Sequence, residues 1–183
     1  MNIICDTSII VNFLKINRLD LLGCSSRTFW VSEHVHQEIT LDYPALQQLF
    51  EFALENLSIQ KIAVKDPQEL NLFIKLMKNK KLSAGECAAI AVAACRGYFL
   101  AIDDGHAIKK AKLWITPDRI LRTQDIVAEM IDENLLSDDQ LLLDWDAYYR
   151  FKRPTMTKLF PEDNLLQETS LQWGIFPLVL KSG

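Results

Sequence analysis

The chain has 183 residues, of which 49% are hydrophobic and 24% are charged, close to the average for globular proteins. Its net charge of −4 excludes binding of nucleic acid through overall positive charge, although lysines cluster locally. The longest uncharged apolar run, residues 87–95, is far shorter than the roughly 20 residues of a membrane-spanning helix. We therefore expect no membrane partner.

Cysteine usage and the start of the chain narrow the class further. The chain has four cysteines and no Cys-x-x-Cys pair, which excludes a zinc ribbon and favours reduced thiols. Asp6 interrupts the apolar start of the chain, and no basic stretch precedes it, so no signal peptide is expected. These features predict a cytoplasmic protein.

Short apolar runs typical of strands alternate along the chain with segments of helical periodicity. Strands are expected over residues 2–5, 29–31, 57–64, 98–102 and 113–116. Helices are expected over residues 9–16, from Ser32 onward, and over 43–55, 67–81, 87–95, 107–112, 123–134 and 137–152. This alternation predicts an α/β protein, a three-layer α/β/α sandwich with a mainly parallel central sheet.

The composition of the chain changes after Arg153. Three of the six prolines fall beyond it, among scattered apolar residues that include Trp173 and Phe176. So apolar a segment is not expected to stay free in water. We expect residues 1–150 to form one domain and residues 151–183 to form a C-terminal extension that packs on the domain or on a partner.

Acidic residues follow two of the expected strands. Asp6 follows the first strand, and Asp103 and Asp104 follow the strand over residues 98–102. Ligands of parallel α/β sheets bind beyond the carboxyl ends of the strands, so this edge is a candidate site. The competing interpretation is local: Asp6 caps a helix, and Asp103-Asp104-Gly105 forms a turn with a cap.

Two glutamates extend this acidic set, and each also has a structural explanation. Glu86 lies in the pattern Ser83-x-x-Glu86, a capping box in which the carboxylate accepts the Ser83 backbone N–H. Glu38 faces the same side of its helix as Val35 and Ile39, near the boundary of the core. Taken singly, none of these carboxylates establishes a function.

In combination, four short motifs resemble the PIN domain family, which includes the toxin ribonucleases of bacterial toxin–antitoxin pairs. The motifs are Ile4-Cys5-Asp6-Thr7-Ser8, Val35-His36-Gln37-Glu38, Leu82-Ser83-Ala84-Gly85-Glu86-Cys87-Ala88-Ala89-Ile90-Ala91 and Ala101-Ile102-Asp103-Asp104. The resemblance spans about residues 1–130.

The resemblance implies a metal-dependent nuclease whose acids gather at the carboxyl edge of the sheet. The family acids match Asp6, Glu38, Glu86 and either Asp103 or Asp104, because the doubled acid leaves the register open. Ser8 matches a hydroxyl that helps orient metal-bound water, and Lys109 and Lys110 match a basic region. The expected catalytic set is Asp6, Ser8, Glu38, Glu86, Asp103 and Asp104, and the expected metal ligands are Asp6, Glu86, Asp103 and Asp104.

The chemistry of phosphodiester hydrolysis agrees with this resemblance. The reaction needs neutralised phosphate charge and a deprotonated water, and Mg²⁺ or Mn²⁺ supplies both. A set of carboxylates without His or Cys suits these hard cations better than zinc. Lysines at 75–81 and 109–112 are expected to flank the acids and hold RNA. The resemblance adds an antitoxin protein and a second copy of the chain as candidate partners.

Three other enzyme classes fail at their motifs. A haloacid-dehalogenase-like phosphatase needs a second Asp two residues after the first, where this chain has Ser8. A dinucleotide-binding fold needs a glycine-rich loop after the first strand, and no glycine precedes Gly23. A Ser-His-Asp enzyme lacks a plausible triad around Ser8. The alternative that stays open is a catalytically weak PIN-like module that binds RNA or protein.

Overall fold

The structure is a computed structural model, and it describes residues 1–136. The expected helix over residues 137–152 and the extension over residues 151–183 lie outside the described residues. The division of the chain at residue 150 therefore stays a prediction.

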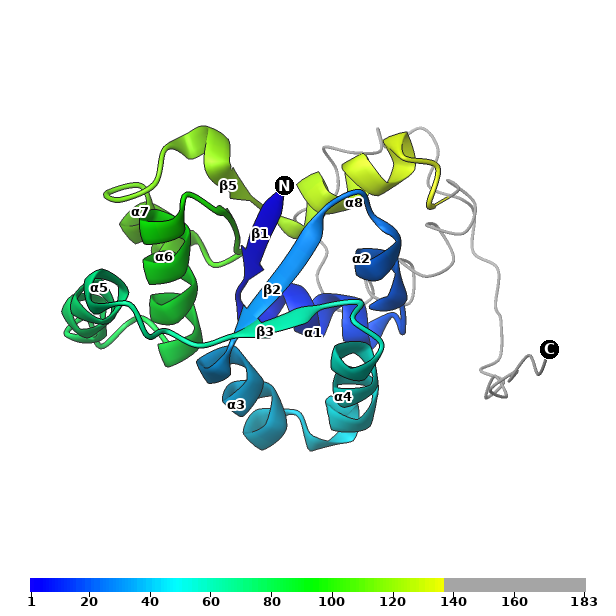
Figure 1. Ribbon diagram of the computed structural model, residues 1–183, viewed down its shortest axis with the longest axis horizontal. Coiled ribbons are helices and arrows are strands. Elements are labelled where there is room, and N and C mark those ends of the chain that lie inside the picture. The colour runs from blue at the N-terminus through cyan, green and yellow to red at the C-terminus, as the bar shows by residue number, and fades with distance from the viewer. Residues whose placement is uncertain (137–183) are drawn as a thin grey trace, which may run out of the picture. The chain divides into compact units, whose positions relative to one another are not determined.

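Five parallel strands form one central sheet, in the order β3-β2-β1-β4-β5 (Figure 1). The central strand β1 is buried along Ile3–Cys5, and its neighbour β4 is buried at Leu100 and Ala101. Continuous apolar runs of this kind are typical of parallel strands covered on both faces. The strands are β1 (Asn2–Cys5), β2 (Thr28–Ser32), β3 (Gln60–Ile62), β4 (Phe99–Ala101) and β5 (Ile120–Leu121).

Helices cover the sheet on both sides. Figure 1 shows α5, α6 and α7 on one side and α1, α2 and α8 on the other. The fold is therefore the expected three-layer α/β/α arrangement with an all-parallel sheet. The helices are α1 (Thr7–Lys15), α2 (Asp20–Cys24), α3 (Glu33–Asp42), η1 (Pro44–Leu46), α4 (Gln47–Glu55), α5 (Pro67–Met77), α6 (Ala84–Arg96), α7 (Gly105–Ala111), η2 (Pro117–Arg119) and α8 (Thr123–Asp132).

The small-residue helix α6 forms the centre of one core layer. Its residues Cys87–Ala93 are all fully buried, and the apolar side chains of α5 and α7 pack in the same cluster. The alanines in this run allow close approach of the helix to the strands, because their side chains are small. Tight packing here fixes the start of α6 at the carboxyl edge of the sheet.

Three expected elements differ from the observed ones. The strand expected over residues 113–116 is wrong: the chain turns there, with Trp114 and Ile115 N–H groups donating to the Ala111 carbonyl. The last strand of the described residues is instead β5, which begins four residues after the expected strand ends. The helix expected over residues 43–55 divides into η1 and α4, and the one expected to reach Lys81 ends at Met77.

The cysteines and the helix lengths bear on two further expectations. All four cysteines are free thiols, as the sequence predicted. Within residues 1–136 no helix has both the length and the apolar character needed to cross a bilayer.

Candidate active site

Asp6 lies at the point where β1 passes into α1. Its backbone N–H donates to the Ala101 carbonyl at 3.0 Å, which ties the ends of β1 and β4 together. One of its carboxylate oxygens accepts the Ile9 backbone N–H at 3.1 Å, so the residue caps α1. The Ser8 hydroxyl lies 2.9 Å from both carboxylate oxygens. The side chain is thus held rigidly, and Asp6 is only 2% exposed.

The charge of Asp6 is unfavourable where it lies. Burial raises the pKa of its carboxyl from an ordinary 3.8 to about 7, against the opposing effect of the hydrogen bonds from Ile9 and Ser8. The negative charges of Asp103 and Glu86 contribute to this raised value after burial. Within residues 1–136, no lysine or arginine forms an ion pair with Asp6. The site therefore gathers negative charge that the described residues leave uncompensated.

Glu86 satisfies the capping-box prediction and also belongs to the acidic cluster. Its Oε2 accepts the Ser83 backbone N–H at 2.8 Å, and the Ser83 hydroxyl accepts the Glu86 N–H at 3.1 Å. Burial raises the pKa of Glu86, the Ser83 hydrogen bond opposes this, and the charges of Asp104 and Glu38 raise the pKa further. The structural and the chemical interpretations of this residue are therefore compatible.

Glu38 joins three helices through both of its carboxylate oxygens. Thr7, in the first turn of α1, donates its hydroxyl to Oε2, and the Gly85 backbone N–H at the start of α6 donates to Oε1 at 2.7 Å. A Cβ at position 85 would lie 2.5 Å from Glu38 Oε2 and 2.9 Å from Thr7 Oγ1. The absence of a side chain at Gly85 therefore makes room for the Glu38 carboxylate at the start of α6.

The two consecutive aspartates after β4 have separate roles in the fold. Asp104 is exposed and caps α7, accepting the His106 and Ala107 N–H groups at 2.8 Å each. Asp103 is half-buried and bonds to Asn12 and Thr123, while its charge raises the pKa of Asp6. Asp103 is therefore the better candidate for a partner of Asp6, and Asp104 lies nearer to Glu86.

The two groups of lysines expected to bind RNA lie at different places relative to these acidic residues. Lys109 and Lys110 lie in the last turn of α7, at the opposite end of that helix from Asp104. Lysines 78, 80 and 81 lie in the turn that leads directly into the capping box of α6. The Asn79 amide in this turn lies 3.4 Å from His106 Nε2, in the first turn of α7. The 78–81 turn is thus beside the acidic edge.

Sequence reasoning missed four residues that organise this cluster. Thr7 and Gly85 fall inside the motifs quoted above, but the spacing gave no indication that they contact Glu38. Asn12 and Thr123 bond to Asp103 across 91 and 20 positions of the chain. One signal was present: Asn12 is a polar residue within the apolar run of residues 9–14, at a position where a core side chain is expected.

The donor chemistry of the cluster fits a hard divalent cation. Within residues 1–136, no three Asp, Glu, His or Cys side chains converge closely enough to chelate an ion by themselves. Mg²⁺ is commonly held by one or two carboxylates and keeps several of its waters, which does not require such a cage. The pKa of Asp6 is raised mainly by burial and additionally by the charges of Asp103 and Glu86, and a bound cation would favour the ionised carboxylate against both effects.

A family model described as PIN domain matches residues 2–115 of the chain. Searches of curated proteins and of solved structures each returned no significant match. The matched range contains Asp6, Glu38, Glu86, Asp103 and Asp104 and covers more than half of the chain. The chain therefore belongs to the PIN domain family, whose members are generally nucleases that act on nucleic acid.

Proposed function

We propose that the protein is a metal-dependent endoribonuclease that hydrolyses RNA phosphodiester bonds. The observation that carries this proposal is Asp6, a buried carboxylate beside Asp103 and Glu86 whose pKa is raised to about 7. A buried acid that repels its neighbours costs stability, so a functional role is the physical reason to keep it. Its place at the carboxyl edge of a parallel sheet is where ligands bind in such folds.

One or two of the carboxylates of Asp6, Glu86 and Asp103 would hold Mg²⁺ or Mn²⁺ directly, and the ion would keep several of its waters, with Asp104 at the edge of the cluster. When bound, the ion supplies charge neutralisation at the phosphate and lowers the pKa of a water. Ser8 fixes the orientation of the Asp6 carboxylate through its hydroxyl. Glu38 acts from the opposite side by holding the start of α6, and with it Glu86, in place.

The substrate would be held beside the acids by lysine side chains. Lysines 78, 80 and 81 are all exposed and lie in the turn before α6. Each phosphate contact on single-stranded RNA contributes about −0.7 to the slope of log affinity against log salt. Neutralising these lysines together is expected to flatten the slope by about 2, whereas Lys109→Gln with Lys110→Gln is expected to change it less.

Cleavage of a fluorescent single-stranded RNA, with Mn²⁺ or with EDTA, tests the proposal. The wild-type protein should cleave only with the metal, and Asp6→Asn should be inactive. Glu86→Gln is informative because the glutamine oxygen can still accept the Ser83 N–H while it lacks the charge. Loss of cleavage in folded Glu86→Gln supports a chemical role, and full cleavage would leave Glu86 as a capping residue only.

The competing function is a PIN-like module that binds RNA or protein without cutting. It predicts RNA binding that is the same with Mn²⁺ and with EDTA, and no cleavage in either. The uncompensated acidic cluster favours the nuclease, because a binding module has no use for an anion-repelling pocket beside its lysines.

Two kinds of protein partner are proposed, an antitoxin and a second copy of the chain. Assignment to a toxin–antitoxin pair follows the family resemblance, and growth arrest on expression, absent in Asp6→Asn, would support it. For a homodimer the supporting observation is an exposed apolar stripe of Leu70, Ile74 and Met77 on α5. Light scattering of the wild type and of Ile74→Glu would test it, and a monomeric wild type would contradict it.

A further inference from the structure

We propose that Asn12 and Thr123 are positioning residues that fix the Asp103 carboxylate in the acidic cluster, so that the start of α8 is part of the active site. This inference rests on the proposed metal-dependent function. It assigns to two residues outside the acidic set the task of orienting one of its members. It also selects Asp103 over Asp104 as the acid that acts with Asp6.

Both oxygens of Asp103 are engaged by these two residues. The Asn12 amide nitrogen donates to Oδ2 at 2.8 Å, and the Thr123 hydroxyl donates to the same oxygen at 2.7 Å. The Thr123 backbone N–H donates to Oδ1 at 3.0 Å. Three donors on one carboxylate leave it one orientation. The side chain of Asp103 is thus held in place by groups from α1 and α8.

Asn12 and Thr123 also hold each other. The Asn12 amide nitrogen lies 2.9 Å from the Thr123 hydroxyl oxygen, across 111 positions of the chain. Asn12 is 5% exposed and Thr123 is 6% exposed, so the network is shielded from solvent. Buried polar networks of this kind specify one geometry, because every alternative leaves a donor or acceptor unsatisfied.

The N-terminus of α8 adds a fixed positive potential at Asp103. Thr123 is the first residue of this ten-residue helix, and its N–H is one of the groups that the helix itself leaves unpaired. The Arg122 N–H is satisfied by Asp125 in the same turn, at 2.8 Å. The backbone N–H groups at the start of α8 are therefore satisfied by the carboxylate of Asp125 in the same helix and by the carboxylate of Asp103, which follows β4.

A purely structural role for this network is the less economical explanation. Replacing a buried polar group and its partners by apolar side chains of similar shape is often neutral or stabilising, so packing alone does not require the network. Asp104, the neighbouring acid, is held only by the N–H groups of its own helix. Thr123 also lies beyond residues 2–115, the range that the PIN domain model matches. The site thus uses a part of the chain outside that range.

The test compares Thr123→Val, which removes the hydroxyl at nearly constant shape, with Thr123→Ser, which keeps it. Asn12→Leu removes the amide. Thr40→Val is the matched control, because the Thr40 hydroxyl donates to the backbone carbonyl oxygen of His36, within its own helix α3, at 2.9 Å. For each protein we would measure the Mn²⁺ dissociation constant by calorimetry, kcat and KM on RNA, and the melting temperature in EDTA.

We expect Thr123→Val and Asn12→Leu to weaken Mn²⁺ binding by about tenfold and to lower kcat by about tenfold or more, with KM changed little. Thr123→Ser should restore both values to within about threefold of the wild type, and Thr40→Val should leave both unchanged. A role only in stability would lower the melting temperature of Thr123→Val but leave Mn²⁺ affinity and kcat as in the wild type, and that result overturns the inference.

The outcome separates this inference from the proposed function. A wild-type protein that neither binds Mn²⁺ nor cleaves RNA contradicts the proposed function, and the inference falls with it. An active wild type together with an equally active Thr123→Val contradicts only the inference. If Asn12→Leu fails to fold, the comparison of valine with serine at position 123 decides the question alone.

Discussion

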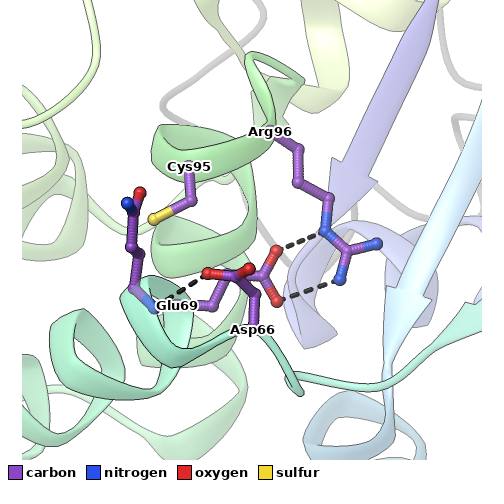
Figure 2. A pocket seen from close by; sticks show the side chains of 5 residues that line it. Asp66, Glu69, Cys95 and Arg96 are labelled. Carbon is purple, nitrogen blue, oxygen red and sulfur yellow. Dashed lines mark hydrogen bonds and ion pairs between the residues drawn. The ribbon is translucent and has the colours of Figure 1, made fainter.

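Within residues 1–136, two carboxylates are almost completely buried, and their surroundings differ. Asp6 is 2% exposed and Glu69 is 1% exposed. Glu69 lies in α5 and forms an ion pair with Arg96, the last residue of α6, and both side chains line a pocket of about 340 Å³ (Figure 2). The pocket is lined by Asp66, Gln68, Glu69, Cys95 and Arg96.

Glu69 has the partner that a buried charge ordinarily needs. Arg96 donates through Nε to Oε1 of Glu69 and through Nη2 to Oε2 at 2.9 Å, and the same Nη2 lies 3.3 Å from the Ala63 carbonyl oxygen. The hydrogen bond from Glu69 raises the pKa of Arg96 further above its ordinary value. This pair fastens α5 to α6, and we assign it a structural role.

Asp6 has hydrogen-bond donors and two acidic neighbours in place of a cation. The raised pKa of Asp6 and the ordinary ion pair at Glu69 show that burial alone does not mark a functional acid. The distinguishing feature is charge that the described residues leave uncompensated. The pocket thus lies at the structural ion pair, whereas the proposed functional region is identified by its electrostatics.

Asp6→Asn should give the largest effect, because it removes the acid at the centre of the cluster. Asparagine can still accept the Ile9 N–H, so the α1 cap is kept. We expect Mn²⁺-dependent cleavage to fall by about 100-fold or more, with an unchanged or higher melting temperature in EDTA. Asp20→Asn, at an exposed carboxylate, is the control. Retained cleavage in Asp6→Asn would contradict a catalytic role for the buried acid Asp6.

Glu69→Gln should give the opposite pattern. The substitution leaves Arg96 facing a neutral amide, and breaking a buried pair in this way costs about 2–3 kcal/mol, since Arg96 is partly solvated. Cleavage measured well below the melting temperature should be unchanged. Glu55→Gln, at an exposed position of α4, should change the free energy of unfolding by less than about 0.5 kcal/mol. A loss of activity in folded Glu69→Gln would make the α5–α6 pair functional as well.

The pH dependence of stability should separate the two carboxylates without any substrate. Because the folded-state pKa of Asp6 lies above its ordinary 3.8, at about 7, the folded state binds its proton more tightly than the unfolded state. The contribution of Asp6 to stability is therefore most favourable below about pH 4, becomes less favourable as the pH rises to about 7, and is level above that.

Asp6→Asn lacks this titration, so its free energy of unfolding in EDTA should exceed that of the wild type by a margin that grows from pH 4 to pH 7. The limit is on the order of 4 kcal/mol, because the pKa of Asp6 rises from 3.8 to about 7 and one pKa unit is worth about 1.4 kcal/mol. Denaturant titrations at three pH values measure it. A margin that does not change with pH would contradict a raised pKa at Asp6.

Gly85→Ala should give a smaller effect than the substitutions above, and it tests how Glu38 contacts the start of α6. The added Cβ would meet Glu38 Oε2 at 2.5 Å and Thr7 Oγ1 at 2.9 Å, so Glu38 must move away from the start of α6. We expect a loss of about 1–3 kcal/mol in the free energy of unfolding and weaker cleavage. Gly105→Ala is the control, because a Cβ there meets nothing within 4 Å. Equal stability of the two variants would show that Glu38 moves freely.

The sequence alone determined the features that depend on neighbours along the chain. Asp6, Ser32 and Ser83 cap the helices that follow them, and Glu86 completes the capping box, as the local patterns predicted. The alternation of apolar runs with helical periodicity also predicted the parallel three-layer fold. These features were readable because a cap or a period involves residues within a few positions of one another.

Only the tertiary structure decided which polar groups meet. The bonds of Asp103 to Asn12 and of Glu38 to Gly85 join residues 91 and 47 positions apart, and no local pattern carries that information. The strand expected over residues 113–116 failed for the same reason, since Ile115 is buried by packing at a turn and not by pairing in the sheet. Local chemistry thus placed Asp6, Glu86, Asp103 and Asp104 at the ends of their elements, and packing of α1, α6 and α8 decided which acids became neighbours.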